Sequence, residues 1–305
     1  MKTLIGYLVF SAILALPGDT VISAEKIFQE QGGTTAEITN PGSLLWEISG
    51  NGMEKPSYLF GTLHLICPEK FSFPETWKTS FEKTEQLILE IDFSDPGLMQ
   101  QFQKGMMMEG GKSIQDFLST GDLQFLEDFL ADSLMMDINQ VRMIMPMILS
   151  SFFYSHLLEC QPMSYDLFLM EEAIINGYKI NGLETVNDQL SVFKTISYDE
   201  QALLLMDMIK DYDQTRKLYN RMAELYIDQN LDGLYELILL ESKGIPDFDE
   251  TFLVQRNRNW IPEIERFIFA KPAFIAVGAG HLPGDEGLVR LLQEQGYDMR
   301  PVIPE

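Results

Sequence analysis

Apolar and polar positions along the chain predict short strands near both ends and helices between them. Apolar runs of strand length lie at residues 44–48, 58–63, 86–91, 179–183, 273–277 and 298–302. Asn51-Gly52, between the first two runs, is a turn signal, so these two strands should form a hairpin. Residues 97–155 and 187–242 show helical patterns instead. We therefore expect an α/β or α+β fold, with a central sheet and a large inserted helical block.

Further helices are expected at residues 74–83, 166–176, 251–269 and 285–295. The first of them follows Ser72-Phe73-Pro74-Glu75, which has the form of a capping box with proline in the first turn. No tandem repeat of solenoid length interrupts this pattern.

The first 24 residues have the pattern of a secretory signal peptide. Lys2 precedes a 13-residue apolar run at 4–16, a Pro-Gly break and Ala24, after which cleavage is expected. The alternative is an uncleaved N-terminal anchor. Residues 25–43 predict a flexible leader before a domain at 44–305. No later segment has 18 consecutive apolar residues. We therefore expect an exported protein, periplasmic or secreted, with no stable membrane insertion after cleavage.

The strongly negative net charge of the chain argues against nucleic acid and anionic membranes as partners. The chain has 22 Lys and Arg against 46 Asp and Glu, a formal net charge of −24. Binding to nucleic acid needs clustered basic side chains, and docking on an anionic membrane needs them as well. Neither partner is expected.

Export also changes how the cysteines are interpreted. Cys67 and Cys160 are the only two in the sequence, and an even number in an oxidising compartment favours a disulfide. The alternative is two buried free thiols. A disulfide would tie the loop after residues 58–63 to the helical block.

A strand that ends in Gly-x-x-His occurs twice, with Gly61 and His64 in the first copy and Gly278 and His281 in the second. Strand ends are where α/β sheets build ligand sites, and histidine there can bind a metal or a substrate. Gly278 and Gly280 would let the backbone turn sharply or approach a neighbour closely. The alternative is two structural histidines that cap loops. The third histidine, His156, lies between apolar helices and is not expected to be a ligand.

Carboxylates follow two other strands. Glu90 ends one strand with Asp92 two residues on, and Glu184 follows the strand at 179–183. In a parallel sheet these ends would meet the two histidines at one edge. His64, His281 and Glu90 would suit Zn²⁺, Mn²⁺ or Co²⁺, with Glu90 or Glu184 as general base on a bound water.

Three further residues are candidates to support such a site. Arg256 or Asn257 could anchor one of the site carboxylates, and Asp92 is a further supporting candidate. For Arg256 and Asn257 the alternative is an exposed helix face.

Taken in order, these segments resemble the TraB/GumN family, which includes the Tiki metalloproteases. The resemblance rests on Gly61-Thr-Leu-His64, the strand LILEID, the segment GLET, Arg256-Asn257 and the ending VGAGHLPGDEGL, and it runs from about residue 43 to 303. It implies an α/β core related to the erythromycin-esterase and ChaN-like group. It also implies metal-dependent peptide cleavage through His64, His281 and Glu90. Glu184, Arg256 and Asn257 match other recurrent family positions.

Three functions follow as hypotheses. The first is an exported metal-dependent hydrolase, a peptidase, acting on a peptide or protein substrate. The second is a non-enzymatic protein that captures a peptide or signal, as expected for a relative of the pheromone-shutdown type. The third is a haem- or metal-handling protein.

Overall fold

The computed structural model describes residues 42–242 and 244–304. The predicted signal peptide and the predicted leader up to residue 41 lie outside these described residues. Within them, no helix is long and apolar enough to cross a membrane.

A six-stranded mixed sheet forms the core, in the order β4-β3-β5-β2-β1-β6. Its strands are β1 (Leu45–Gly50), β2 (Ser57–Thr62), β3 (Gln86–Leu89), β4 (Lys179–Gly182), β5 (Ala273–Gly278) and β6 (Tyr297–Pro301). The neighbours β4, β3, β5 and β2 are parallel, whereas β1 is antiparallel to β2 and β6. The predicted α/β class, the hairpin and the parallel arrangement are therefore confirmed.

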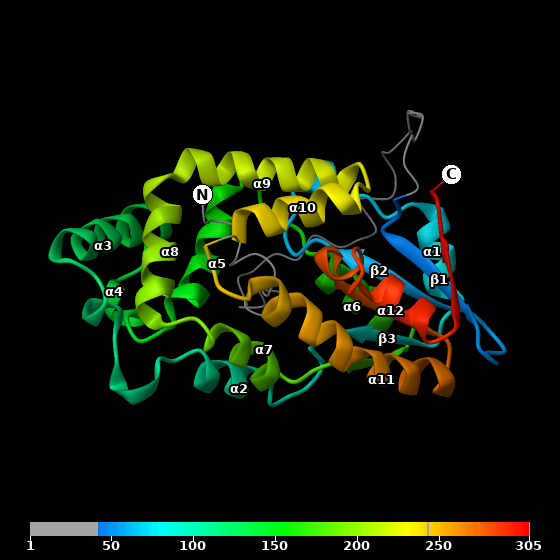
Figure 1. The fold of residues 1–305 in the computed structure, drawn as a ribbon. Coiled ribbons are helices and arrows are strands. Elements are labelled where there is room, and N and C mark those ends of the chain that lie inside the picture. Colours follow the sequence, from blue (N-terminus) through cyan, green and yellow to red (C-terminus); the bar gives the residue numbers. More distant parts are fainter. Residues whose placement is uncertain (1–41, 243, 305) are drawn as a thin grey trace.

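In the described part of the chain, twelve α-helices surround the sheet and form the inserted block. They are α1 (Glu75–Glu82), α2 (Leu98–Gly105), α3 (Thr120–Leu134), α4 (Ile138–Val141), α5 (Pro146–Leu157), α6 (Tyr165–Ile175), α7 (Val186–Phe193), α8 (Tyr198–Lys210), α9 (Tyr212–Ile227), α10 (Leu231–Ser242), α11 (Gln255–Ala270) and α12 (Leu288–Glu294). Figure 1 shows the sheet at one end of the molecule and α3, α4, α5 and α8 at the other. Every residue of β2, β3 and β5 is buried, so helices cover both faces of these central strands.

Aromatic side chains fix the position of the central strands. Phe60 on β2 lies within 6 Å, between ring centroids, of Phe73, Trp77, Tyr165 and Phe274. These rings come from α1, α6, β5 and the loop before α1, so their packing locks the strands to the helices. The ends of β2 and β5 are thereby held in place.

The predicted capping box before α1 is wrong. The N-cap residue is Pro74, and no side chain caps the helix. Ser72 instead donates its backbone N–H to the Tyr165 hydroxyl at 3.2 Å, and its carbonyl accepts from that hydroxyl at 2.9 Å. Tertiary contacts with α6 replace the local cap at this site.

A disulfide joins Cys67 and Cys160, whose Cα atoms are 5.8 Å apart. The prediction is confirmed. Beside it, Ile66 and Met163 exchange two backbone hydrogen bonds of 2.9 and 2.8 Å. The loop after β2 is therefore tied covalently and by hydrogen bonds to the segment between α5 and α6.

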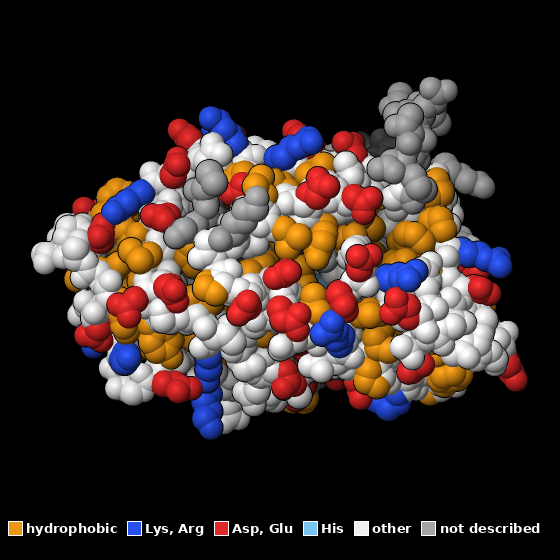
Figure 2. All heavy atoms as spheres, viewed as in Figure 1, with side chains coloured by type: hydrophobic (Ala, Val, Ile, Leu, Met, Phe, Trp, Pro, Cys, Tyr) orange, Lys and Arg blue, Asp and Glu red, His pale blue; other side chains and the backbone are white. Residues whose placement is uncertain are grey.

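Acidic side chains outnumber basic ones in this chain, by 46 to 22. On the face shown in Figure 2 they are scattered over the molecule and interspersed with apolar patches. His156 is exposed on α5.

Candidate functional site at the carboxyl edge of the sheet

The carboxyl ends of the four parallel strands meet at one edge of the sheet. His64 follows β2, Glu90 follows β3, Glu184 follows β4, and His281 ends a 3₁₀ turn that follows β5. Neighbouring strand ends are in register, with Thr62 paired to Gly278 and Leu89 paired to Gly182. These four predicted side chains therefore lie at one edge, as expected for a site in an open α/β sheet.

Glu90 is almost completely buried, at 1% exposure, and both of its oxygens accept hydrogen bonds. Oε1 accepts from the backbone N–H of Gly278 at 2.8 Å. Oε2 accepts from Arg256 Nη2 at 2.7 Å and from Gln189 Nε2 at 3.0 Å. The carboxylate is thus held by a strand end, by α7 and by α11.

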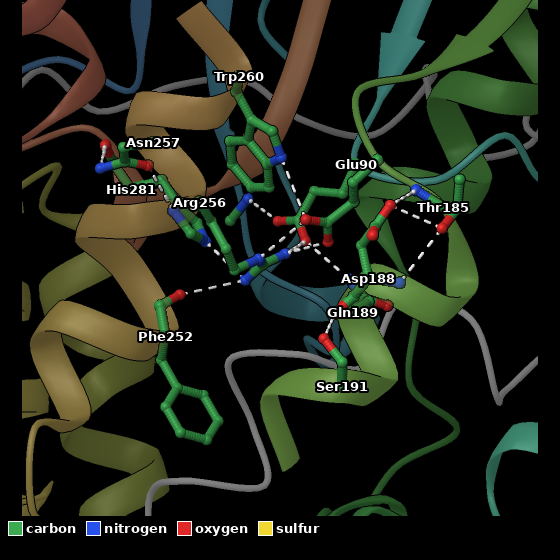
Figure 3. A network of polar contacts seen from close by, with 12 residues as sticks. Glu90, Thr185, Asp188, Gln189, Ser191, Phe252, Arg256, Asn257, Trp260 and His281 are labelled. Atoms are coloured by element: carbon green, nitrogen blue, oxygen red, sulfur yellow. Dashed lines mark hydrogen bonds and ion pairs between the residues drawn. The ribbon is translucent and has the colours of Figure 1, made fainter. Parts of the chain in front are cut away.

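Arg256 lies at the centre of this network (Figure 3), and each of its five N–H groups can reach an acceptor. Nε and Nη2 bind the two oxygens of Glu184 at 3.2 and 2.7 Å, a two-point ion pair. Nη2 also reaches Glu90, while Nη1 lies 3.3 Å from the Phe252 carbonyl and 3.1 Å from His281 Nε2. A short π-helical turn, Glu250–Val254, leads directly into α11 and supplies that carbonyl.

Trp260 completes the surroundings of the guanidinium. Its ring centroid lies 4.7 Å from the Arg256 guanidinium carbon, a cation–π contact. Its indole N–H donates to Glu184 Oε2 at 3.1 Å. Trp260, one turn after Arg256 on α11, therefore contacts both the guanidinium and its partner Glu184.

Two buried carboxyl groups, Glu90 and Glu184, face the one guanidinium of Arg256. Burial raises the pKa of Glu184, and the nearby Arg256 offsets only part of that rise. Burial alone would lower the pKa of Arg256, but Glu184 and Glu90 raise that pKa above its ordinary value. Arg256 therefore stays charged.

His281 is fully buried and neutral. Asn257 Nδ2 donates to the carbonyls of His281 and Glu286 at 3.3 and 2.8 Å, which turns its oxygen toward His281 Nδ1 at 2.7 Å. Nδ1 therefore carries the proton, and Nε2 accepts from Arg256. Burial, followed by the charge of Arg256 and the proximity of His64, lowers the pKa of His281 well below its ordinary value.

His64 is oriented by a residue that the sequence did not single out. Asp166, on α6 and 1% exposed, places Oδ2 3.1 Å from His64 Nδ1 and accepts the Thr62 hydroxyl on Oδ1 at 3.2 Å. An aspartate in the first turn of a helix is common for reasons of helix electrostatics, so nothing in the sequence distinguished it. Asp166 turns Nε2 of His64 toward Gly278.

Three side chains converge over the α-carbon of Gly278. A Cβ there would lie 3.3 Å from Glu90 Oε1, 3.7 Å from His281 Cδ2 and 3.8 Å from His64 Nε2. The backbone of Gly278 has φ −51°, which any residue adopts. Glycine is therefore needed at this position for space and not for its conformation.

A sequence model of the TraB/PrgY/gumN family matches residues 44–301, nearly all of the described chain. The chain belongs to the TraB/PrgY/gumN family. The predicted resemblance is confirmed, and the matched region contains every residue of the site at the carboxyl edge.

Relatives of this family member include proteins named metalloproteases. It is 19% identical over 320 residues to Metalloprotease TIKI1 of Danio rerio, covering 87% of this chain and 64% of that protein. It is 20% identical over 312 residues to Metalloprotease TIKI1 of Homo sapiens, covering 84% and 61%. It is 20% identical over 324 residues to the Metalloprotease TIKI homolog of Nematostella vectensis, covering 87% and 68%. No solved structure matches significantly. The chain thus spans less than two thirds of the length of the first two relatives.

The donor set of this TraB/PrgY/gumN protein does not fit a metal ion as it is folded. Among the described residues, no group of three or more His, Cys, Asp or Glu side chains could hold one. Glu90, Glu184 and Nε2 of His281 are all directed at Arg256. Of the three predicted ligands, Glu90 and His281 contact the guanidinium of Arg256, whereas His64 pairs with Asp166.

Other predicted residues divide between the site and its surroundings. Arg256 lies against the two carboxylates, and Asn257 contacts His281 and no carboxylate of the site. Asp92 is not drawn in, because its carboxylate accepts from the backbone and hydroxyl of Ser94 in a turn. Gly61 lies where β2 passes close to the turn after β5, and Gly280 is buried within that turn.

Two cavities border the cluster. One of about 340 Å³ is lined by Glu184 and Arg256 together with polar side chains of α7 and α11, among them Asp188, Ser191 and Asn259. A second, of about 20 Å³, lies between His64, Gly278 and apolar side chains of α9 and α10. The larger cavity is the space beside the cluster that could admit part of a substrate.

Proposed function

We propose that this TraB/PrgY/gumN protein is an exported hydrolase that cleaves peptide bonds. One observation carries the proposal: His64, Glu90 and His281 converge over Gly278, beside the buried charge of Arg256. The names of the relatives support a protease, at about one fifth identity. A peptide or protein is the proposed substrate.

His64 is the proposed general base. Asp166 accepts the Nδ1 proton, so Nε2 would take a proton from a water molecule as its oxygen attacks the carbonyl carbon. The same proton would then pass to the leaving amine when the C–N bond breaks. We propose His64 as the base in place of the predicted Glu90 or Glu184, because the oxygens of both carboxylates accept hydrogen bonds from Arg256 and its neighbours.

Arg256 is the proposed group that stabilises the negative charge on the carbonyl oxygen. Its Nη1 contacts two neutral acceptors, Phe252 O and His281 Nε2, whereas Nε and Nη2 bind carboxylates. Exchanging a neutral acceptor for a developing oxyanion strengthens the hydrogen bond. Nη1 is therefore the nitrogen best suited to a substrate.

A divalent metal, predicted as Mn²⁺, Co²⁺ or Zn²⁺, is supported by the names of the relatives and opposed by the donor atoms of this chain. No step of the proposed reaction passes through one.

The deciding experiment exposes the purified chain to an unbiased peptide library and identifies products by mass spectrometry. We expect His64→Gln to lower cleavage roughly 10²-fold or more, because the base is lost. His156→Gln is the matched control, since His156 is exposed on α5 and outside the cluster. A well-folded protein that cleaves nothing in the library would favour a peptide-capturing protein instead.

Export is part of the proposal. The Cys67–Cys160 disulfide supports an oxidising compartment, the periplasm or the exterior. Intact mass of the protein recovered after export should correspond to cleavage after Ala24. Recovery of the whole chain in membranes would favour the uncleaved anchor.

A further inference from the structure

We infer that Arg256 is the resident cation of this site: its guanidinium takes the position among Glu90, Glu184 and His281 that a divalent ion would require. The inference concerns the cofactor of the site and does not depend on which bond is cleaved.

The atoms that a divalent ion would need as ligands are already bound to Arg256. A divalent ion at this edge of the sheet would need carboxylate oxygens of Glu90 and Glu184 and Nε2 of His281 as ligands. Those atoms lie 2.7, 2.7 and 3.1 Å from nitrogens of Arg256. Metal–ligand distances are about 2.0–2.2 Å, so an ion cannot share these atoms while the guanidinium remains among them.

The charge balance leads to the same conclusion. Glu90 and Glu184 both face the one guanidinium of Arg256 in a buried cluster, and His281 presents Nε2 to it as an acceptor. A divalent ion added beside Arg256 would place two cations against each other in a low-dielectric interior. A divalent ion in place of Arg256 would instead balance both carboxylates.

Arg256 is also firmly anchored. It is 4% exposed, and α11 carries Trp260 one turn later, with its ring against the guanidinium. The Phe252 carbonyl in the preceding π-helical turn accepts from Nη1. Moving the side chain aside would break an ion pair to each carboxylate and leave both of them buried without a partner cation, which is strongly unfavourable.

Removing the guanidinium should therefore create a metal site. In Arg256→Ala, Glu90, Glu184 and His281 would keep their positions through Gln189, Gly278, Trp260 and Asn257. Three ligands and two uncompensated negative charges would then surround an empty space.

The test titrates metal-stripped full-length protein with Mn²⁺, following free Mn²⁺ by electron paramagnetic resonance, and with Co²⁺ by calorimetry. We expect no stoichiometric binding to the wild type. Arg256→Ala should bind one equivalent at least 100-fold more tightly than the wild type, and its Tm should rise when Co²⁺ is added. Arg256→Lys, which keeps a positive charge, should bind no ion.

Arg258→Ala is the matched control, because Arg258 lies on the same helix but is exposed and pairs with Glu286 and Glu250. It should behave like the wild type. If Arg256→Ala folds only when Co²⁺ is present, that dependence itself supports the inference. If it does not fold at all, the wild-type titration decides alone.

Two results would overturn the inference. One is a single equivalent of Mn²⁺ or Co²⁺ on the wild type that disappears in His281→Gln. The other is a folded Arg256→Ala protein that binds no ion. Neither readout measures peptide cleavage, so failure of the proposed hydrolase activity would leave this result unchanged, and the reverse also holds.

Discussion

Replacing Gly278 by alanine should strongly lower the proposed hydrolase activity while leaving the fold almost intact. The added methyl group would occupy the point over which Glu90, His281 and His64 converge, 3.3, 3.7 and 3.8 Å from their nearest atoms. A water molecule or a substrate carbonyl between these groups would have to share that space. We expect a fall in kcat/KM of roughly 10²-fold or more, which is at least about 2.7 kcal/mol of transition-state stabilisation.

The stability of Gly278→Ala follows from two opposing effects. The backbone at φ −51° accepts alanine without strain, and the less flexible unfolded chain stabilises the variant by about 0.4–1 kcal/mol. The contact of 3.3 Å with Glu90 Oε1 is tight and costs about 1 kcal/mol, at the low end for overpacking. The free energy of unfolding in urea should therefore stay within about 1 kcal/mol of the wild type.

Gly61→Ala provides the contrasting case. A Cβ at Gly61 would lie 3.0 Å from the backbone Cα of Ala279 and 3.1 Å from its Cβ, atoms that no rotamer change can move. We expect a loss of about 1–3 kcal/mol of stability. The rates of peptide cleavage by the two variants and the wild type are compared at equal concentrations of folded protein. The reasoning is refuted if Gly278→Ala retains wild-type activity, or if its loss of activity parallels a loss of fold.

Three further results are expected. Replacing both Cys67 and Cys160 by serine should lower the free energy of unfolding by up to about 4–5 kcal/mol in denaturant titrations, because the disulfide closes a loop of 93 residues. Asp166→Asn should lower kcat roughly 10²-fold with little change in KM, because an amide can present either its oxygen or its N–H group to His64 Nδ1 and no longer fixes the tautomer. An unchanged kcat would count against this role. Because His281 has a lowered pKa, unfolding takes up a proton below pH 6.5, so stability should fall on acidification by up to about 1.4 kcal/mol per pH unit. His281→Gln should remove that component, and the difference between the two proteins isolates it from Glu184, whose raised pKa acts in the opposite direction.

The sequence predicted which strand ends meet at the edge of the sheet, but not the hydrogen bonds and ion pairs that the side chains form there. His64, Glu90, Glu184 and His281 could be placed together because parallel strands end at one edge, a rule that depends only on order and spacing. The prediction for Asp92 was wrong because it assumed that the alternation of side chains along a strand continues to residue 92, whereas β3 ends at Leu89. Strand periodicity has no meaning beyond the last paired residue.

Arg256 and Asp166 show why the remainder of the site could not be predicted. Arg256 was a candidate partner for a carboxylate, but its central position depends on how α11 crosses the sheet edge, which helical periodicity does not specify. Asp166 and His64 are 102 residues apart in the sequence. They meet because α6, which carries Asp166, packs on β3 and β4. Which helix packs where is decided by tertiary contacts and not by either local pattern.

A role in the proposed reaction explains the buried charges of this cluster better than a contribution to the stability of the fold. Its charges are joined only in the complete fold, since Glu90 and Arg256 are 166 residues apart and Glu184 and Arg256 are 72 apart. Desolvation removes most of what such pairs contribute, and apolar side chains of similar volume often stabilise a protein as well or better. A neutral histidine and a carboxylate with a raised pKa, beside a polar cavity at the ends of parallel strands, are the properties expected of a reacting site. The retained charges therefore support the proposal that this edge acts on a substrate.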